Sequence, residues 1–95
     1  MNIHEKKLKE GKKMKFNSKE LEYLITYAEQ VKVLCPVIKY NEQLTKDLFF
    51  NMKDKTKVTD KNIHHIENNF IALDLIGLTY DEKLRRKIDI YLEDK

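Results

Sequence analysis

Residues 59–77 read TDKNIHHIENNFIALDLIG, and this stretch decides the fold. Large apolar side chains recur in it at helical spacing and form one stripe: Ile63, Ile66, Phe70 and Leu73. Three further apolar side chains fall on other sides of the same helix: Ile71, Leu75 and Ile76. The second half of this helix is therefore apolar on nearly every side, which is typical of a helix at the centre of a domain.

Both ends of this segment carry helix-boundary signals. Thr59 and Asp60 are good N-cap residues, because their side-chain oxygens can accept hydrogen bonds from the first turn. Gly77 stands where a left-handed C-cap falls, and Leu78 beyond it is placed to contact Leu73, as in a Schellman motif. The sequence therefore predicts a helix that begins at residue 59 or 60 and ends at Gly77.

An earlier helix is predicted from Asn17 to about residue 34. Asn17 and Glu20 have the spacing of a capping box, and Phe16 and Leu21 have that of a hydrophobic staple. Pro36 ends the helix, because the residue before a proline disfavours the α region. The core side of this helix is expected to carry Leu21, Leu24, Ile25, Ala28, Val31 and Cys35.

Two further helices complete the predicted domain. One covers about residues 40–52, and the other begins directly after the C-cap glycine, with Thr79 as its N-cap and Glu82 completing a second capping box. The chain of 95 residues contains two Gly and one Pro, which leaves little room for the tight turns of an all-β fold. We therefore expect an all-α fold, a compact four-helix domain over residues 16–95, preceded by a short, flexible basic arm over residues 1–15.

Basic residues are concentrated in this arm and in one predicted loop. Residues 1–20 carry seven Lys and three Glu, and residues 53–61 carry four Lys and two Asp, whereas the whole chain has a net charge of +3. Such segments either keep a chain soluble or contact an acidic partner or phosphate groups. The candidate contact residues in the arm are Lys6, Lys7, Lys9, Lys12, Lys13 and Lys15.

No residue pattern in the sequence indicates catalysis or a bound cofactor. His64 and His65 are adjacent, so on a helix their side chains point about 100° apart and do not face one metal ion together. Cys35 is the single cysteine and lies at an apolar position, and there is no glycine-rich phosphate loop. We therefore expect a protein that is not an enzyme and that holds neither a metal nor a cofactor.

Hydropathy and cysteine usage bear on the compartment. No apolar run reaches the roughly 18 residues needed to span a bilayer. A single cysteine excludes an intramolecular disulfide and favours a reducing compartment. We therefore expect a cytoplasmic protein with no membrane partner.

The predicted 17–34 helix has a second apolar side beside its core stripe. Tyr23, Tyr27 and Leu34 lie on this side, which either packs between two neighbouring helices or contacts another protein. Asp74 lies close to the apolar stripe of the 59–77 helix, so its carboxylate must reach water or find a basic partner. We predict these four residues to bind a partner protein, and a homodimer remains open.

Residues 68–91 read NNFIALDLIGLTYDEKLRRKIDIY and resemble the small helical antitoxins of the Fic family. That family has a helix ending in a Ser-x-x-x-Glu-Gly element, followed by a short link and a second helix. Here Gly77 matches the glycine, whereas Ala72 stands at the position of the serine and Ile76 at that of the inhibitory glutamate. The resemblance covers about a quarter of the chain and implies a small regulator that binds a larger protein, although the residue that would carry the inhibition is absent.

These observations favour one function over a second. The first is a small non-enzymatic regulator or inhibitor that binds a larger protein, of the type carried by phages or plasmids, including antitoxin-like or anti-defence roles. The excess of Lys over Arg, 17 to 2, suits the AT-rich genomes of such elements. The alternative is a small DNA-binding transcriptional regulator that uses its basic arm and loop. Phosphate binding weakens steeply with salt, whereas an apolar protein interface does not.

Overall fold

The computed structural model describes residues 14–93, and these residues form an all-α four-helix domain. The helices are α2 (Ser18–Leu34), α3 (Asn41–Asp54), α4 (Asp60–Ile76) and α5 (Glu82–Glu93). This architecture confirms the predicted fold class. Most of the predicted arm, residues 1–13, lies outside the described residues.

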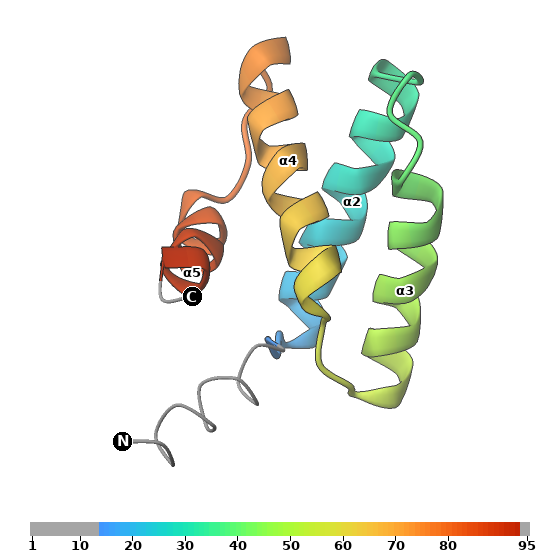
Figure 1. The fold of residues 1–95 in the computed structure, drawn as a ribbon, viewed down its shortest axis with the longest axis vertical. Helices are drawn as coiled ribbons and strands as arrows, with labels where there is room; N and C mark the ends of the chain where they lie inside the picture. The colour runs from blue at the N-terminus through green and yellow to red at the C-terminus, as the bar shows by residue number, and fades with distance from the viewer. Residues whose placement is uncertain (1–13, 94–95) are drawn as a thin grey trace.

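Helices α2 and α4 lie side by side in the middle of the domain (Figure 1). Helix α3 runs back along α2 on one side, and α5 packs beside α4 on the other (Figure 1). Helix α4 contacts all three other helices, as expected for a central helix. Its contact with α3 is much smaller than the contact between α2 and α3.

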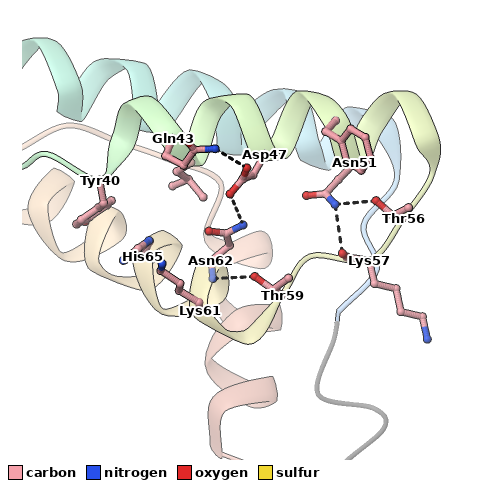
Figure 2. A pocket seen from close by; sticks show the side chains of 12 residues that line it. Tyr40, Gln43, Asp47, Asn51, Thr56, Lys57, Thr59, Lys61, Asn62 and His65 are labelled. Atoms are coloured by element: carbon pink, nitrogen blue, oxygen red, sulfur yellow. Dashed lines mark hydrogen bonds between the residues drawn. The ribbon is translucent and has the colours of Figure 1, made fainter.

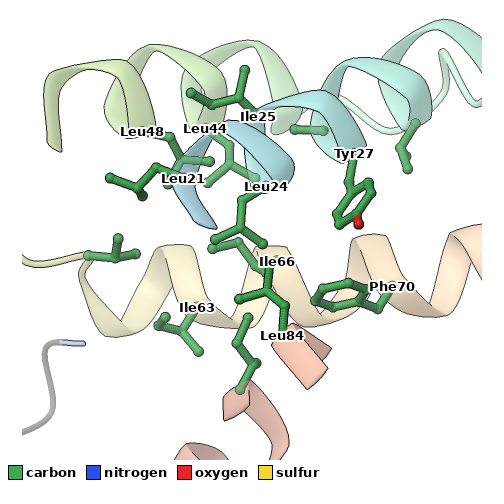
Figure 3. Close-up of a cluster of buried hydrophobic side chains, with 14 of the residues drawn as sticks. Leu21, Leu24, Ile25, Tyr27, Leu44, Leu48, Ile63, Ile66, Phe70 and Leu84 are labelled. Atoms are coloured by element: carbon green, nitrogen blue, oxygen red, sulfur yellow. The ribbon is translucent and has the colours of Figure 1, made fainter. Parts of the chain in front are cut away.

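The core is formed where the apolar sides of these helices meet. Figure 3 shows Leu24 of α2 above Ile66 of α4, and the ring of Tyr27 beside that of Phe70. Further buried apolar side chains include Leu21, Ile25, Ala28, Val31, Leu44, Leu48, Ile63, Leu73, Leu84 and Ile88. The α2 stripe and the α4 stripe predicted from helical spacing are thus the two halves of one core.

The N-terminus of α2 is capped as its sequence predicts. The Asn17 side chain accepts a hydrogen bond from the Glu20 N–H at 2.8 Å, and the Glu20 carboxylate accepts one from the Asn17 N–H at 3.0 Å. Phe16, just before the cap, is 6% exposed and joins the same core as Leu21. The capping box and the apolar residue before it therefore fix where the chain enters the domain.

Both ends of α4 also confirm the prediction. Thr59 is the N-cap, and its hydroxyl accepts a hydrogen bond from the Asn62 N–H. At the other end Gly77 is left-handed, with φ of 89°. The Leu78 N–H donates to the Leu73 carbonyl at 2.9 Å, and the Gly77 N–H donates to the Asp74 carbonyl at 3.1 Å as well as to that of Leu73. This is the Schellman arrangement, which reverses the chain between α4 and α5.

We expect Gly77→Val to lower the free energy of unfolding by about 1–2 kcal/mol, the cost of the left-handed conformation for a residue with a Cβ. A Cβ at Gly77 would meet no heavy atom within 4 Å, so the loss should come from the backbone alone. Urea denaturation measures it. Gly77→Asn is the matched control and should lose less, because Asn tolerates this conformation. Equal losses for Val and Asn would contradict a backbone origin.

The start of α5 differs from the sequence prediction. The helix begins at Glu82 instead of directly after Thr79. Its cap is Asp81, whose carboxylate accepts hydrogen bonds from the N–H groups of Lys83 and Leu84 at 2.9 and 3.2 Å. The Asp81 N–H donates to the Tyr27 hydroxyl at 2.7 Å, and the Tyr80 ring packs against core aromatics. These contacts hold the link in an extended form, and the predicted Thr79–Glu82 capping box is wrong.

Helix α3 runs two residues past its predicted end and closes with Lys55 in a left-handed conformation, with φ of 57°. The Asn51 side chain holds the loop that follows, donating to the Thr56 hydroxyl at 2.8 Å and to the Lys57 carbonyl at 3.2 Å. The basic loop is therefore ordered by a side chain of the helix before it.

The first two described residues, Met14 and Lys15, lie within the predicted arm. Met14 and Val58 exchange both backbone hydrogen bonds, at 3.0 and 2.6 Å, in an isolated antiparallel bridge. Val58 is fully buried and Met14 is partly buried against the core. Met14 and the exposed Lys15 therefore belong to the domain, because the chain is fixed to the loop between α3 and α4 before α2 begins.

Candidate functional site

Tyr27, one of the predicted partner-binding residues, is a core residue. It is 8% exposed, and its ring lies edge-on to Phe70 and Tyr80, with ring centroids 5.6 and 6.4 Å away. Burial raises the pKa of its hydroxyl, which accepts the hydrogen bond from the Asp81 N–H. The sequence left two alternatives for this side of α2, packing between helices or contact with another protein. At Tyr27 this side packs inside the domain.

Tyr23 and Leu34 occupy the same side of α2 but are exposed. The Tyr23 ring is 38% exposed and stacks on Tyr27, with centroids 6.3 Å apart and planes 8° from parallel. Leu34 is 51% exposed at the last residue of α2. The predicted second apolar side of α2 is thus divided: Tyr27 packs in the core, whereas Tyr23 and Leu34 face solvent.

Asp74 forms an ion pair with Arg85, which is the basic partner expected for a carboxylate beside the apolar stripe. Its carboxylate accepts a hydrogen bond from the Tyr80 hydroxyl at 2.7 Å and one from Arg85 at 2.5 Å. These two bonds lower the pKa of Asp74, which is therefore ionised at neutral pH. The Arg85 guanidinium also donates to the Tyr80 hydroxyl, and it lies over the Phe70 ring, 5.9 Å from the centroid.

We call the resulting surface the tyrosine face, defined by Tyr23, Leu34, Asp74, Tyr80 and Arg85. Tyr27 lies beneath it and contacts the rings of Tyr23 and Tyr80, and Leu34 lies at the end of α2. Tyrosine and arginine are enriched at protein interfaces relative to the rest of the protein surface. The face therefore has the composition of a protein-binding surface.

Sequence reasoning found Tyr23, Leu34 and Asp74 but missed Tyr80 and Arg85. A signal for Arg85 existed, because a carboxylate beside an apolar stripe needs a basic partner and the chain holds only two arginines, side by side in the next helix. Tyr80 gave no comparable signal, since its position depends on how the link after α4 turns.

A second feature, a groove of about 530 Å³ between α3 and α4, was not expected (Figure 2). Figure 2 shows Asp47 between Gln43 and Asn62, whose amides donate to its carboxylate at 2.9 and 3.1 Å. At one end, the Asn51 side chain reaches toward Thr56, which also lines the groove. Most polar groups along this groove are therefore already bonded to one another.

The other end of the groove is closed by an aromatic stack. The rings of Tyr40 and His65 lie 4.1 Å apart and 5° from parallel, and Tyr40 donates to Asn69 at 3.0 Å. Burial, followed by the charge of Lys61, lowers the pKa of His65 and favours its neutral form. Asn69 in turn donates to the fully buried Asn41 at 2.7 Å. This amide chain fastens α3 to α4 where few apolar contacts do so.

The remaining candidates from the sequence are placed as follows. His64 and Asp60 lie one helical turn apart, with 3.9 Å between Nε2 and Oδ2, and Cys35 is half-buried. Among residues 14–93, no group of three or more His, Cys, Asp or Glu side chains could hold a metal ion. Lys6, Lys7, Lys9, Lys12 and Lys13 lie outside the described residues, whereas Lys15 is described and exposed.

None of the helices formed by residues 14–93 has the length and apolar character needed to cross a membrane.

Comparisons of the chain with protein-family models, with curated proteins and with solved structures gave no match. No family model therefore supports the resemblance of residues 68–91 to Fic-type antitoxins.

Proposed function

We propose that this protein is a non-enzymatic regulator or inhibitor that acts by binding a larger protein through its tyrosine face. The observation that supports this most is the pairing of an exposed tyrosine, Tyr23, with the buried Tyr27 beneath it. A ring already held by stacking loses little conformational freedom when a partner covers it, so more of the contact energy appears as affinity.

The rest of the face supports the same function. Arg85 is held in place by Asp74, and their side chains are 25% and 50% exposed, so a partner would meet a fixed arrangement of charges. Leu34 adds an exposed apolar contact on the same side of α2. Tyrosine and arginine are among the residue types that most often dominate binding energy at interfaces. Phage- or plasmid-borne regulators, including antitoxin-like and anti-defence proteins, are the class of protein that we propose.

A small DNA-binding regulator is the second candidate. One observation favours it: the last turn of α3 and the loop after it present Lys53, Lys55 and Lys57 as exposed side chains. Phosphate contacts by these lysines and by the arm would give binding that weakens steeply with salt.

The test is an affinity capture with the full chain from the cells that produce it, comparing the wild type with Tyr23→Ala. We expect the wild type to retain one protein between about 50 and 200 mM salt, a range over which phosphate binding falls sharply. Tyr23→Ala should weaken this binding about thirty-fold, the loss expected at a hot spot of about 2 kcal/mol.

Phe49→Ala is the matched control, because Phe49 is an aromatic residue of α3 that is 53% exposed and lies outside the tyrosine face. It should retain the partner. Equal retention by Tyr23→Ala would contradict the proposal, and capture of DNA that is lost at the higher salt concentration would favour the second candidate. If the captured protein is a second copy of the chain, sedimentation of the wild type and Tyr23→Ala will show it as a dimer that the variant loses.

A further inference from the structure

Met14 and the outer side of α5 line an open hollow that is not part of the tyrosine face. Its volume is about 500 Å³, and its lining includes Met14, Ile90 and Tyr91. Ile90 is 51% exposed, although it is one of the large aliphatic residues of the chain. Ile90 and Met14 therefore give the hollow an apolar floor that is open to solvent.

The rim of the hollow is basic. Lys83, Arg86 and Lys87 line it together with Ile90, because spacings of three, four and seven residues place side chains on one side of a helix. Lys87 is bonded to Glu20 at 3.1 Å and lies over the Phe16 ring, 4.8 Å from its centroid. Lys83 and Arg86 form no ion pair with any of residues 14–93, so their charges are available to a ligand.

The charge of the hollow limits what can occupy it. Residues 1–13 of the same chain carry five Lys and two Glu, so this segment is itself basic and would be repelled by the rim. The occupant that complements the rim is acidic.

We propose that this hollow binds an acidic segment of another protein, which inserts a large apolar side chain between Met14 and Ile90 and places carboxylates against Lys83 and Arg86. Phosphate groups of a nucleic acid would also be attracted by the rim, but they would leave the apolar floor uncovered. A segment that combines carboxylates with an aliphatic or aromatic side chain uses both parts of the surface.

The hollow is separate from the tyrosine face. Arg85, which belongs to that face, points to the opposite side of α5 from Lys83 and Ile90, because residues two and five apart on a helix do not share a side. A test of binding at the hollow therefore does not decide whether the tyrosine face binds a partner. Tyr23→Ala should bind a ligand of the hollow as the wild type does.

The test uses the full chain and a fluorescein-labelled peptide in which glutamates flank one leucine and one phenylalanine, with fluorescence anisotropy as the readout. We expect saturable binding to the wild type, weakened at least about ten-fold by Arg86→Glu and by Ile90→Asp. Lys46→Glu and Leu75→Asp are the matched controls, because both residues are exposed on other helices, and they should bind as the wild type does.

Several outcomes would overturn the proposal. These are an absence of saturable binding, equal binding by Ile90→Asp, or equal binding of a peptide whose leucine and phenylalanine are replaced by glycine. Duplex DNA that displaces the peptide and binds Ile90→Asp as well as the wild type would show that the rim serves nucleic acid instead.

Discussion

Tyr27→Ala should lower the free energy of unfolding by about 3–5 kcal/mol, the range measured for large buried aromatic residues. The ring is almost wholly buried between Phe70 and Tyr80, so its removal leaves a cavity among aromatic side chains. The Asp81 N–H would also lose the hydroxyl to which it donates, just where α5 begins. Because a small domain has about 5–15 kcal/mol in total, this loss would leave the chain close to unfolding.

Tyr23→Ala is the internal comparison for this prediction. Tyr23 has the same side chain one helical turn away and stacks on Tyr27, but it is partly exposed and forms part of the surface. Its removal should cost roughly 1 kcal/mol or less, as for most exposed positions and a lost ring contact. Urea denaturation of the two single variants measures both values. Similar losses of stability would contradict the different burial of Tyr23 and Tyr27.

A chain that begins at Asn17 should be less stable than one that begins at Lys13 by about 3 kcal/mol, the sum of one buried aromatic side chain and two backbone hydrogen bonds. The shorter chain lacks Phe16, which is 6% exposed, and the two backbone hydrogen bonds between Met14 and Val58. It keeps the side chains of Asn17 and Glu20, so the Glu20 N–H can still donate to the Asn17 side chain.

Thermal denaturation followed by circular dichroism at 222 nm measures this difference. For a domain of this size, 3 kcal/mol corresponds to a decrease in melting temperature of more than about 10 °C. Phe16→Ala in the full chain separates the side chain from the backbone bridge and should account for more than half of the loss. If the two truncated chains melt within about 2 °C of each other, the bridge between Met14 and Val58 contributes nothing to stability.

The features that the sequence predicted well are those decided within a few residues. The capping box of Asn17 and Glu20 and the left-handed Gly77 depend on side chains three or fewer positions away, so their spacing was sufficient. The start of α5 was predicted wrongly because the contact that decides it joins Asp81 to Tyr27, 54 residues earlier. Local spacing holds no information about such a contact.

The candidate site shows the same division. A helical wheel identified a second apolar side on α2, but it could not show that neighbouring aromatic rings cover Tyr27 and leave Tyr23 exposed. The α3–α4 groove was missed altogether, because asparagines such as Asn41 and Asn69 look like surface residues until a partner 28 positions away is found. Their burial follows only once both helices are placed.

The way α5 is attached has a consequence for how the molecule behaves as a whole. Only Leu84 and Ile88 of this helix are buried, and polar bonds supply much of the remaining attachment, including that between Tyr91 and Asp60 at 3.0 Å. Detachment of α5 is therefore expected to be the lowest-energy local opening of the domain, visible as faster amide hydrogen exchange in this helix than in α2 or α4.

Both proposed surfaces include residues of this one helix, Arg85 on one side and Arg86 on the other. A ligand that binds either surface favours the attached state and so raises the population that is competent to bind at the other. The two sites are then thermodynamically linked, and by reciprocity each ligand increases the affinity for the other by the same factor.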